Sequence, residues 1–89
     1  MKVSQTTQFR KDVKRQRKRG KNLRKLMDVV DLLEAGEGLP ERLRDHALSG
    51  SWIGWRDCHV EPDWVLIYKA LPEEDELILG RTGSHADLF

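Results

Sequence analysis

The chain has little cysteine or proline: one cysteine, Cys58, and three prolines occur among its 89 residues. A lone cysteine has no partner for an internal disulfide and no second thiol for a metal, which excludes a disulfide scaffold and argues against redox chemistry. The sequence also lacks an apolar run near the roughly 20 residues that a membrane span needs. Its N-terminus turns basic without the apolar stretch of a secretion signal. We therefore expect a cytoplasmic protein that has no membrane partner.

Length and composition indicate one folded unit. A chain of 89 residues builds one core, because a chain this short buries only about 60 to 65% of its unfolded surface. We expect residues 1–89 to form a single domain. Its 38% hydrophobic and 35% charged residues are typical of a globular protein.

Charge is distributed unevenly along the chain. Residues 1–27 contain eleven Lys and Arg and one acidic residue, whereas residues 28–89 contain five basic and fourteen acidic residues. The net charge of +1 therefore hides a basic segment and an acidic one. A dense cationic segment attracts polyanions and binds phosphates, which suggests an RNA or DNA partner. The alternative is a solvated helix face that has no ligand.

Periodicity predicts a short strand over residues 3–5 and two helices after it. The first helix starts near Gln8 and ends at Gly20, with an apolar stripe of only Phe9 and Val13. Apolar residues at steps of three and four predict the second helix over residues 23–33, closed by Gly36 or Gly38. We read the stripe of the second helix as core.

From Gly50 onward the period of the pattern falls to two, which predicts strands. They are expected over residues 55–60, 64–68 and 76–81, separated by acidic, proline-containing turns and followed by a loop at 82–84. The order β-α-α-β-β-β predicts an α+β fold, with two N-terminal helices packed on a largely antiparallel sheet.

Three histidines are the residues best suited to proton transfer at neutral pH. His46 precedes the first long strand, His59 ends it and His85 follows the last one, so antiparallel pairing can bring them to one edge of the sheet. Asp63 and Arg81 lie in comparable positions. Arginine is well shaped to hold a phosphate through two hydrogen bonds, and Trp64 and Phe89 can stack on bases.

These residue types suit cleavage of RNA without a metal or a cofactor. The reaction needs a base for the 2′-hydroxyl, a cation for the phosphorane and an acid for the leaving 5′-oxygen. No metal-ligand spacing such as H-x-x-x-H or C-x-x-C is present. The loops that bind nucleoside triphosphates or dinucleotides and the esterase elbow are absent as well. Taken singly, each histidine is equally compatible with a hydrogen-bonded surface residue.

Two stretches resemble the YafQ-type toxins of the RelE-like family. They are Asp45–Trp52 followed by Arg56–Tyr68, and the closing Arg81–Phe89, which reads R-T-G-S-H-A-D-L-F. Over residues 1–44 only the order of strand and helices matches. The resemblance implies a RelE-like fold and a ribosome-dependent endoribonuclease that cuts messenger RNA. It also implies a cognate antitoxin, encoded in the same operon, that covers the site.

The resemblance implies a role for each site residue. The catalytic set is His46, His59, Asp63, Arg81 and His85, with His85 as the general acid, Arg81 stabilising the phosphorane and the general base left open. Trp64 and Phe89 are expected to contact the messenger, although a structural role for Trp64 is an equal alternative. We assign docking on RNA phosphates to four residues of the first helix: Lys14, Arg15, Lys18 and Arg19.

Two other functions remain open at this point. ParE-like toxins share the architecture but act on DNA gyrase without catalysis, and such a protein has no need of three histidines with Arg81. A plain nucleic-acid-binding module explains the basic helix but leaves the C-terminal motif without a role.

Overall fold

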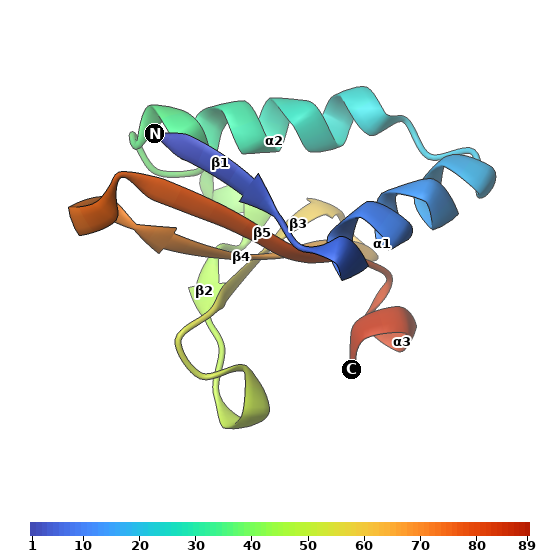
Figure 1. The fold of residues 1–89 in the computed structure, drawn as a ribbon. Coiled ribbons are helices and arrows are strands. Elements are labelled where there is room, and N and C mark those ends of the chain that lie inside the picture. Colours follow the sequence, from blue (N-terminus) through green and yellow to red (C-terminus); the bar gives the residue numbers. More distant parts are fainter.

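A first strand runs beside the last strand at one edge of a five-stranded sheet (Figure 1). The computed structural model describes all residues, 1–89. The strands are β1 (Lys2–Gln5), β2 (His46–Ala47), β3 (Arg56–Glu61), β4 (Trp64–Leu71) and β5 (Glu76–Gly83), and the helices are α1 (Thr7–Lys18), α2 (Leu23–Ala35) and α3 (His85–Leu88). Short 3₁₀ turns lie at Glu41–Leu43 (η1), Gly50–Trp52 (η2) and Pro72–Glu74 (η3). None of the helices is long and apolar enough to cross a membrane.

Capping interactions begin the two long helices, and a glycine ends the second one. The hydroxyl of Thr6 accepts a hydrogen bond from the backbone N–H of Phe9 at 3.0 Å, which caps α1, and the side chain of Asn22 caps α2 at the N–H of Arg24. These bonds satisfy donors that the first helical turn leaves without partners. Gly36 ends α2 at a φ of 72°, a left-handed conformation that glycine adopts at little cost.

The sheet has the order β1-β5-β4-β3-β2. The pair β1–β5 is parallel, and the other three pairs are antiparallel. The prediction of an α+β fold with two helices packed on a largely antiparallel sheet is confirmed. Strand β2 and helix α3 were not predicted, because elements of two and four residues are too short to show a period. The expected loop at 82–84 is instead the end of β5 followed by the cap of α3.

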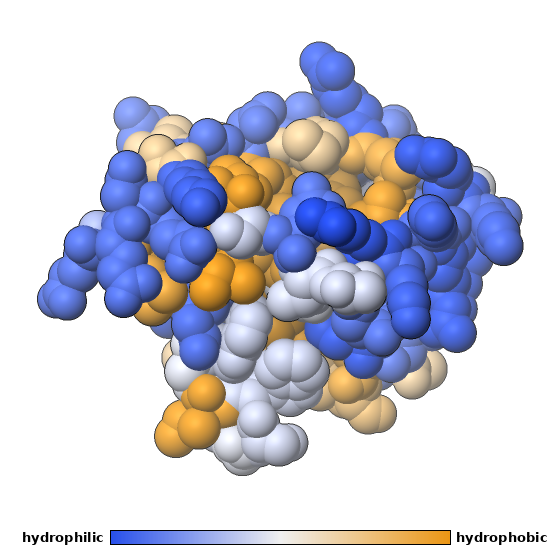
Figure 2. Space-filling model, in the orientation of Figure 1, coloured by the Kyte–Doolittle hydropathy of each residue, from blue (hydrophilic) through white to orange (hydrophobic).

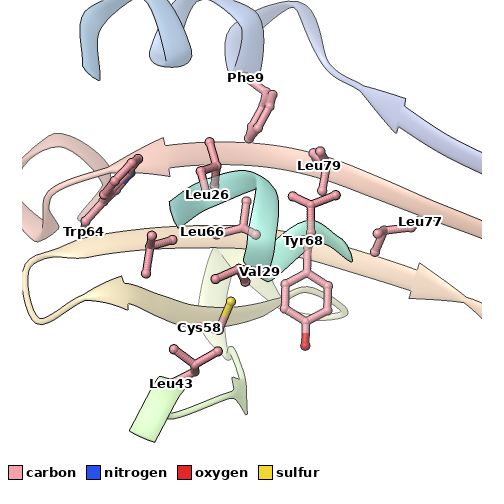
Figure 3. Packing of buried hydrophobic residues seen from close by; sticks show 12 residues of the cluster. Phe9, Leu26, Val29, Leu43, Cys58, Trp64, Leu66, Tyr68, Leu77 and Leu79 are labelled. Carbon is pink, nitrogen blue, oxygen red and sulfur yellow. The ribbon is translucent and has the colours of Figure 1, made fainter. Parts of the chain in front are cut away.

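The main core lies between the helices and one face of the sheet (Figure 3). Phe9 from α1 and Leu26 and Val29 from α2 pack on side chains of the three central strands. The members from those strands are Cys58, Val60, Trp64, Leu66, Tyr68, Leu77 and Leu79. Met27 lies four residues after Leu23 and so falls in the apolar stripe that we read as core, but it is 52% exposed, whereas Val29 is buried. Burial raises the pKa of the Cys58 thiol to about 12, so this cysteine is an inert core residue.

A β-bulge in β5 decides which residues reach the opposite face. Tyr68 pairs with Leu79 and Ile67 pairs with Arg81, so Gly80 is the extra residue. The ring of Trp55 lies where a Cβ on Gly80 would be, at 2.5 Å, and only glycine fits there. The bulge turns Arg81 away from the main core, to the face that carries Ile67 and the smaller cluster of Val65, Ile67 and Leu88.

Candidate active site

The face of the sheet opposite α1 and α2 gathers the histidines. Asp57 and His59 alternate along β3 and therefore share a face with Val65 and Ile67, their partners on β4. Strand β2 brings His46 opposite Asp57. At the other end, α3 begins with His85 directly after β5. The centres of the His59 and His85 rings are 5.3 Å apart, and Phe89 lies 6.1 Å beyond His85.

Asp63 holds His85 at two points. Its Oδ1 accepts one hydrogen bond from the backbone N–H of His85 at 3.1 Å and lies 3.0 Å from the ring nitrogen Nδ1. The bond from the His85 ring, together with that from the backbone, lowers the pKa of Asp63. A carboxylate can only accept, so Nδ1 carries the hydrogen and Nε2 is the nitrogen left for chemistry. The two residues predicted in one site are therefore in direct contact.

His46 and His59 are each held by a backbone carbonyl instead. Nδ1 of His46 lies 2.9 Å from the carbonyl oxygen of Arg44, and Nδ1 of His59 lies 3.2 Å from that of Pro62. A carbonyl accepts a hydrogen bond and does not donate one, so both rings carry hydrogen on Nδ1 and leave Nε2 without a protein partner. In the neutral ring this Nε2 has a free lone pair. Both side chains can therefore act as proton acceptors.

Asp57 belongs to the site although we did not predict it. It is 3% exposed, and burial raises the pKa of its carboxyl, an effect that His46, His59 and His85 partly offset by charge. Oδ1 of Asp57 is buried without a hydrogen-bond donor, although Nδ1 of His46 is only 3.0 Å away, because the ring hydrogen points to Arg44. The sequence signal that could have identified Asp57 is its alternation with His59 along one strand, which places both side chains on the same face.

Arg81 is anchored by an acidic residue of α1. Its Nε and Nη2 donate to the two carboxylate oxygens of Asp12 at 3.0 and 3.1 Å, and this pairing raises the pKa of Arg81. Asp12 is buried and also accepts a bond from the backbone N–H of Thr82 at 3.2 Å. The guanidinium is thus oriented from one side, and its Nη1 has no partner in the protein. Arg81 lies on the same sheet face as the histidines.

The two aromatic residues assigned to messenger contact differ in exposure. Phe89 is 59% exposed, as stacking on a base requires. Trp64 is fully buried, and its Nε1 donates to the hydroxyl of Thr82 at 2.9 Å. The prediction that Trp64 stacks on RNA is therefore wrong, because no face of its indole reaches solvent. Its burial and its bond to Thr82 support the alternative, a structural role in the hairpin.

The four basic residues assigned to RNA docking fall into two pairs. Hydrophilic side chains cover α1 (Figure 2), and Lys14 and Lys18 are exposed on it without an acidic partner. Arg19 and Arg15, however, are bound to Asp87 of α3, at 2.6 and 3.3 Å. The hydrogen bond with Arg19 holds the pKa of Asp87 far below its ordinary value. The expectation that all four are free for phosphates is thus corrected for Arg15 and Arg19.

The site contains no group of three or more His, Cys, Asp or Glu side chains arranged to hold a metal ion. Most of its polar groups are instead held by a single partner residue: Asp63 holds His85, backbone carbonyls hold His46 and His59, and Asp12 holds Arg81. Such an arrangement offers two proton acceptors, one carboxylate-bound imidazole and one cation around a shared face. These are the groups needed for acid–base cleavage of a phosphodiester.

Comparisons with known proteins agree on one family. Residues 1–89 match the family model described as YafQ, bacterial toxin of type II toxin–antitoxin systems. The chain is 47% identical to the mRNA interferase toxin YafQ of Escherichia coli K12 over 89 residues, covering 98% of this chain and 94% of the relative.

Solved structures of relatives have the same fold. The E. coli DinJ–YafQ toxin–antitoxin complex contains a chain with a TM-score of 0.88 and 46% identity, covering 98% of this chain and 94% of that one. A copper-bound L66S mutant toxin from Helicobacter pylori gives a TM-score of 0.93 at 38% identity, with 100% and 99% covered.

Proposed function

The chain belongs to the YafQ family of bacterial toxins of type II toxin–antitoxin systems, and we propose that it cleaves messenger RNA, as the name of its E. coli relative implies. The observation that carries this proposal is the contact between the two histidine rings 5.3 Å apart, with a third histidine opposite the buried Asp57 on the same face. Separate proton donors and acceptors on one face suit phosphodiester cleavage.

The proposed reaction uses the RNA's own 2′-hydroxyl as nucleophile. A base removes the 2′-hydroxyl proton, the 2′-oxygen bonds to phosphorus, and the bond from phosphorus to the 5′-oxygen breaks. An acid then gives its proton to the leaving 5′-oxygen. The products are a 2′,3′-cyclic phosphate, or the 3′-phosphate formed from it by hydrolysis, and a 5′-hydroxyl. No metal is required by this scheme.

We assign the roles from the partners of each side chain. His85 is the general acid, because Asp63 at 3.0 Å balances the charge of its protonated ring and leaves Nε2–H free to donate. His46 and His59 are the two candidates for the base, since their carbonyl partners fix the hydrogen on Nδ1 and leave Nε2 free to accept a proton. Arg81 stabilises the phosphorane through Nη1, and the exposed ring of Phe89 stacks on a base.

We also propose the partners that the family suggests. A relative is solved with the DinJ antitoxin, and an antitoxin encoded in the same operon is expected to bind this chain. The messenger is expected to be cut on the ribosome, with Lys14 and Lys18 as docking cations on α1. Action on ribosomes would place the protein in the cytoplasm.

Cleavage on programmed ribosomes, read by primer extension and end analysis, tests the proposal. The wild-type chain should cut and His85→Ala should cut about 10² to 10⁴ times more slowly, the usual loss for a general acid. Cleavage should persist in EDTA at a magnesium level just sufficient to keep ribosomes assembled, an important control since a relative binds copper. A 3′-hydroxyl product would contradict the scheme. Growth of cells that express the toxin is a separate measurement. If His85→Ala stops growth as strongly as the wild-type chain does, the result would favour the noncatalytic, gyrase-directed alternative.

A further inference from the structure

We propose that a second pocket beside the histidine site, formed by Arg42, Arg44 and His59, binds a nucleotide of the RNA next to the cleaved bond, with its phosphate held by the two arginines. This inference rests on the proposed function and adds a substrate subsite to it. Neither arginine was among the site residues expected from the sequence.

The pocket lies between the η1 turn and the end of β3. It has a volume of about 330 Å³, within the usual range of roughly 300 to 1,000 Å³ for small-molecule sites. Its lining residues are Arg42, Leu43, Arg44, His59, Val60, Glu61 and Pro62. Strand β2 pairs with β3 only at Arg56 and Asp57, so the rest of this edge of β3 has no neighbouring strand and is open to a ligand.

The charge of the pocket suits a phosphate. Arg42 and Arg44 are exposed and have no acidic partner. Arg10 and Arg17 are unpaired too but lie on α1, whereas the remaining arginines are all in ion pairs: Arg15, Arg19, Arg24, Arg56 and Arg81. The one carboxylate in the lining, Glu61, is bound by Lys21 at 3.0 Å and Lys25 at 2.9 Å. With Glu61 neutralised, two arginines dominate the local potential. Planar guanidinium groups are the side chains best suited to phosphate oxygens.

Arg44 connects this pocket to the catalytic histidines. It has a φ of 50°, in the left-handed region that residues with side chains rarely adopt. That conformation caps η1 and turns the Arg44 carbonyl toward Nδ1 of His46, at 2.9 Å. A residue with an unfavourable backbone at a site commonly serves the function of that site. Glycine would fit the backbone better but would lack the cation.

His59 joins the two regions physically. Its ring lies 5.3 Å from that of His85, and the same residue lines the pocket. A strand of RNA with its reacting phosphate between the histidines therefore reaches Arg42 and Arg44 with an adjacent nucleotide. A carboxylate of the antitoxin is the other ligand that two arginines could attract. The test separates these two occupants.

The binding experiment uses the free toxin and adenosine 3′-monophosphate, followed by backbone amide NMR. We expect chemical-shift changes over residues 42–44 and 59–61 that adenosine alone does not produce, and that inorganic phosphate reproduces in part.

Variants of the two arginines test the pocket directly. Arg44→Gly keeps the left-handed backbone and the carbonyl beside His46 while removing the guanidinium. This variant and Arg42→Gln should each weaken nucleotide binding roughly tenfold, the effect of losing a hydrogen bond to a charged group. Lys2→Gln, which removes one exposed charge from β1, is the matched control and should not change it.

Kinetics on programmed ribosomes provide the second measurement. Arg44→Gly and Arg42→Gln should raise KM several-fold and leave kcat within about twofold, and Arg44→Lys should recover part of the loss. Nucleotide shifts confined to other residues, or KM values equal to that of Lys2→Gln, would overturn the subsite. Weaker antitoxin binding with unchanged KM would assign the pocket to the antitoxin instead. Because binding is measured without cleavage, failure of the subsite is distinguishable from an inactive His85 site.

Discussion

Asp87 of α3 accepts two hydrogen bonds from the guanidinium of Arg19, one from Nη1 at 2.6 Å and one from Nη2 at 3.0 Å. The same carboxylate accepts a bond from the backbone N–H of Ser84, which completes a capping box at the start of α3. Helix α3 has only four residues, too few to be stable alone. The pairing of Arg19 with Asp87 therefore helps to fix the element that carries His85 and Phe89, together with the bonds from Asp63 to His85.

Breaking this pairing should loosen α3 and slow cleavage. Arg19→Gln leaves the capping box intact, so we expect a lower kcat, faster amide exchange over residues 84–89, and a smaller loss of global stability than Asp87→Asn, which also alters the box. Hydrogen exchange and ribosome cleavage measure the two effects. Glu73→Gln, at an exposed acid outside the site, is the control. If exchange at the C-terminus does not change, the pairing has no positioning role.

The same pairing should make stability depend on acid. The pKa of Asp87 is held far below its ordinary value by Arg19, so its contribution is fully present above the unfolded pKa of about 4 and is lost as the pH falls through the folded value. Urea unfolding should find Asp87→Asn less stable than wild type at pH 7. That difference should shrink as the pH drops below about 4. A gap independent of pH would contradict the assignment of the ion pair.

Asp57 should show the opposite behaviour. Burial raises the pKa of its carboxyl, so the folded state favours the protonated form, and stability falls as the pH rises from about 4 through the folded pKa. Asp57→Asn lacks this charge and should be more stable than wild type at pH 7, with a gap that closes toward pH 4. We also expect slower cleavage, because the carboxylate beside His46 is lost. Thermal unfolding across pH and ribosome cleavage test both parts, and a variant that is both less stable and fully active would refute them.

Lys14 and Lys18, two of the unpaired cations of α1, should contribute to docking. Changing Lys14 and Lys18 to Gln should lower ribosome affinity and reduce the log–log salt slope by roughly 0.7 to 0.9 for each RNA phosphate that the variant no longer neutralises. The fold should survive, since both side chains are exposed. Ribosome pelleting of the free toxin across a salt series gives the slope. The double change Lys2→Gln and Arg24→Gln removes equal charge outside α1, and an equal effect there would show that only net charge matters.

Trp64 should affect stability and not binding. Trp64→Phe removes the donor to Thr82, whose hydroxyl in turn donates to the carbonyl of Val65 at 2.9 Å. Losing one buried hydrogen bond partner should reduce the free energy of unfolding by about 1 to 3 kcal/mol. Ribosome affinity, measured well below the unfolding temperature, should match wild type. Unchanged stability with reduced affinity would restore the stacking role that burial argues against.

Much of this protein followed from local pattern. The two long helices and three main strands were visible because hydrophobic periods of 3.6 and 2 arise directly from helix and strand geometry. The site residues could be recognised for two reasons. Few side chains titrate near neutrality, as histidine does, or hold phosphates, as arginine does. The stretches Arg56–Tyr68 and Arg81–Phe89 also resembled a known family, and the first of them contains Asp63. Gly36, one of the two glycines predicted to close the second helix, ends it in the structure.

Other features were decided only when the chain folded. The parallel pairing of β1 with β5 joins residues more than seventy positions apart, and no local period records such a pairing. The bulge at Gly80 places Arg81 on the sheet face that carries the histidines. Trp64, which the sequence offered as a residue that contacts RNA, is fully buried in the core. Asp87 forms ion pairs with Arg15 and Arg19, so these two arginines are not free to bind phosphates. Asp57 is buried where the charges of three histidines act on its carboxyl. Burial and charge pairing depend on which side chains meet in space, so they belong to the tertiary structure.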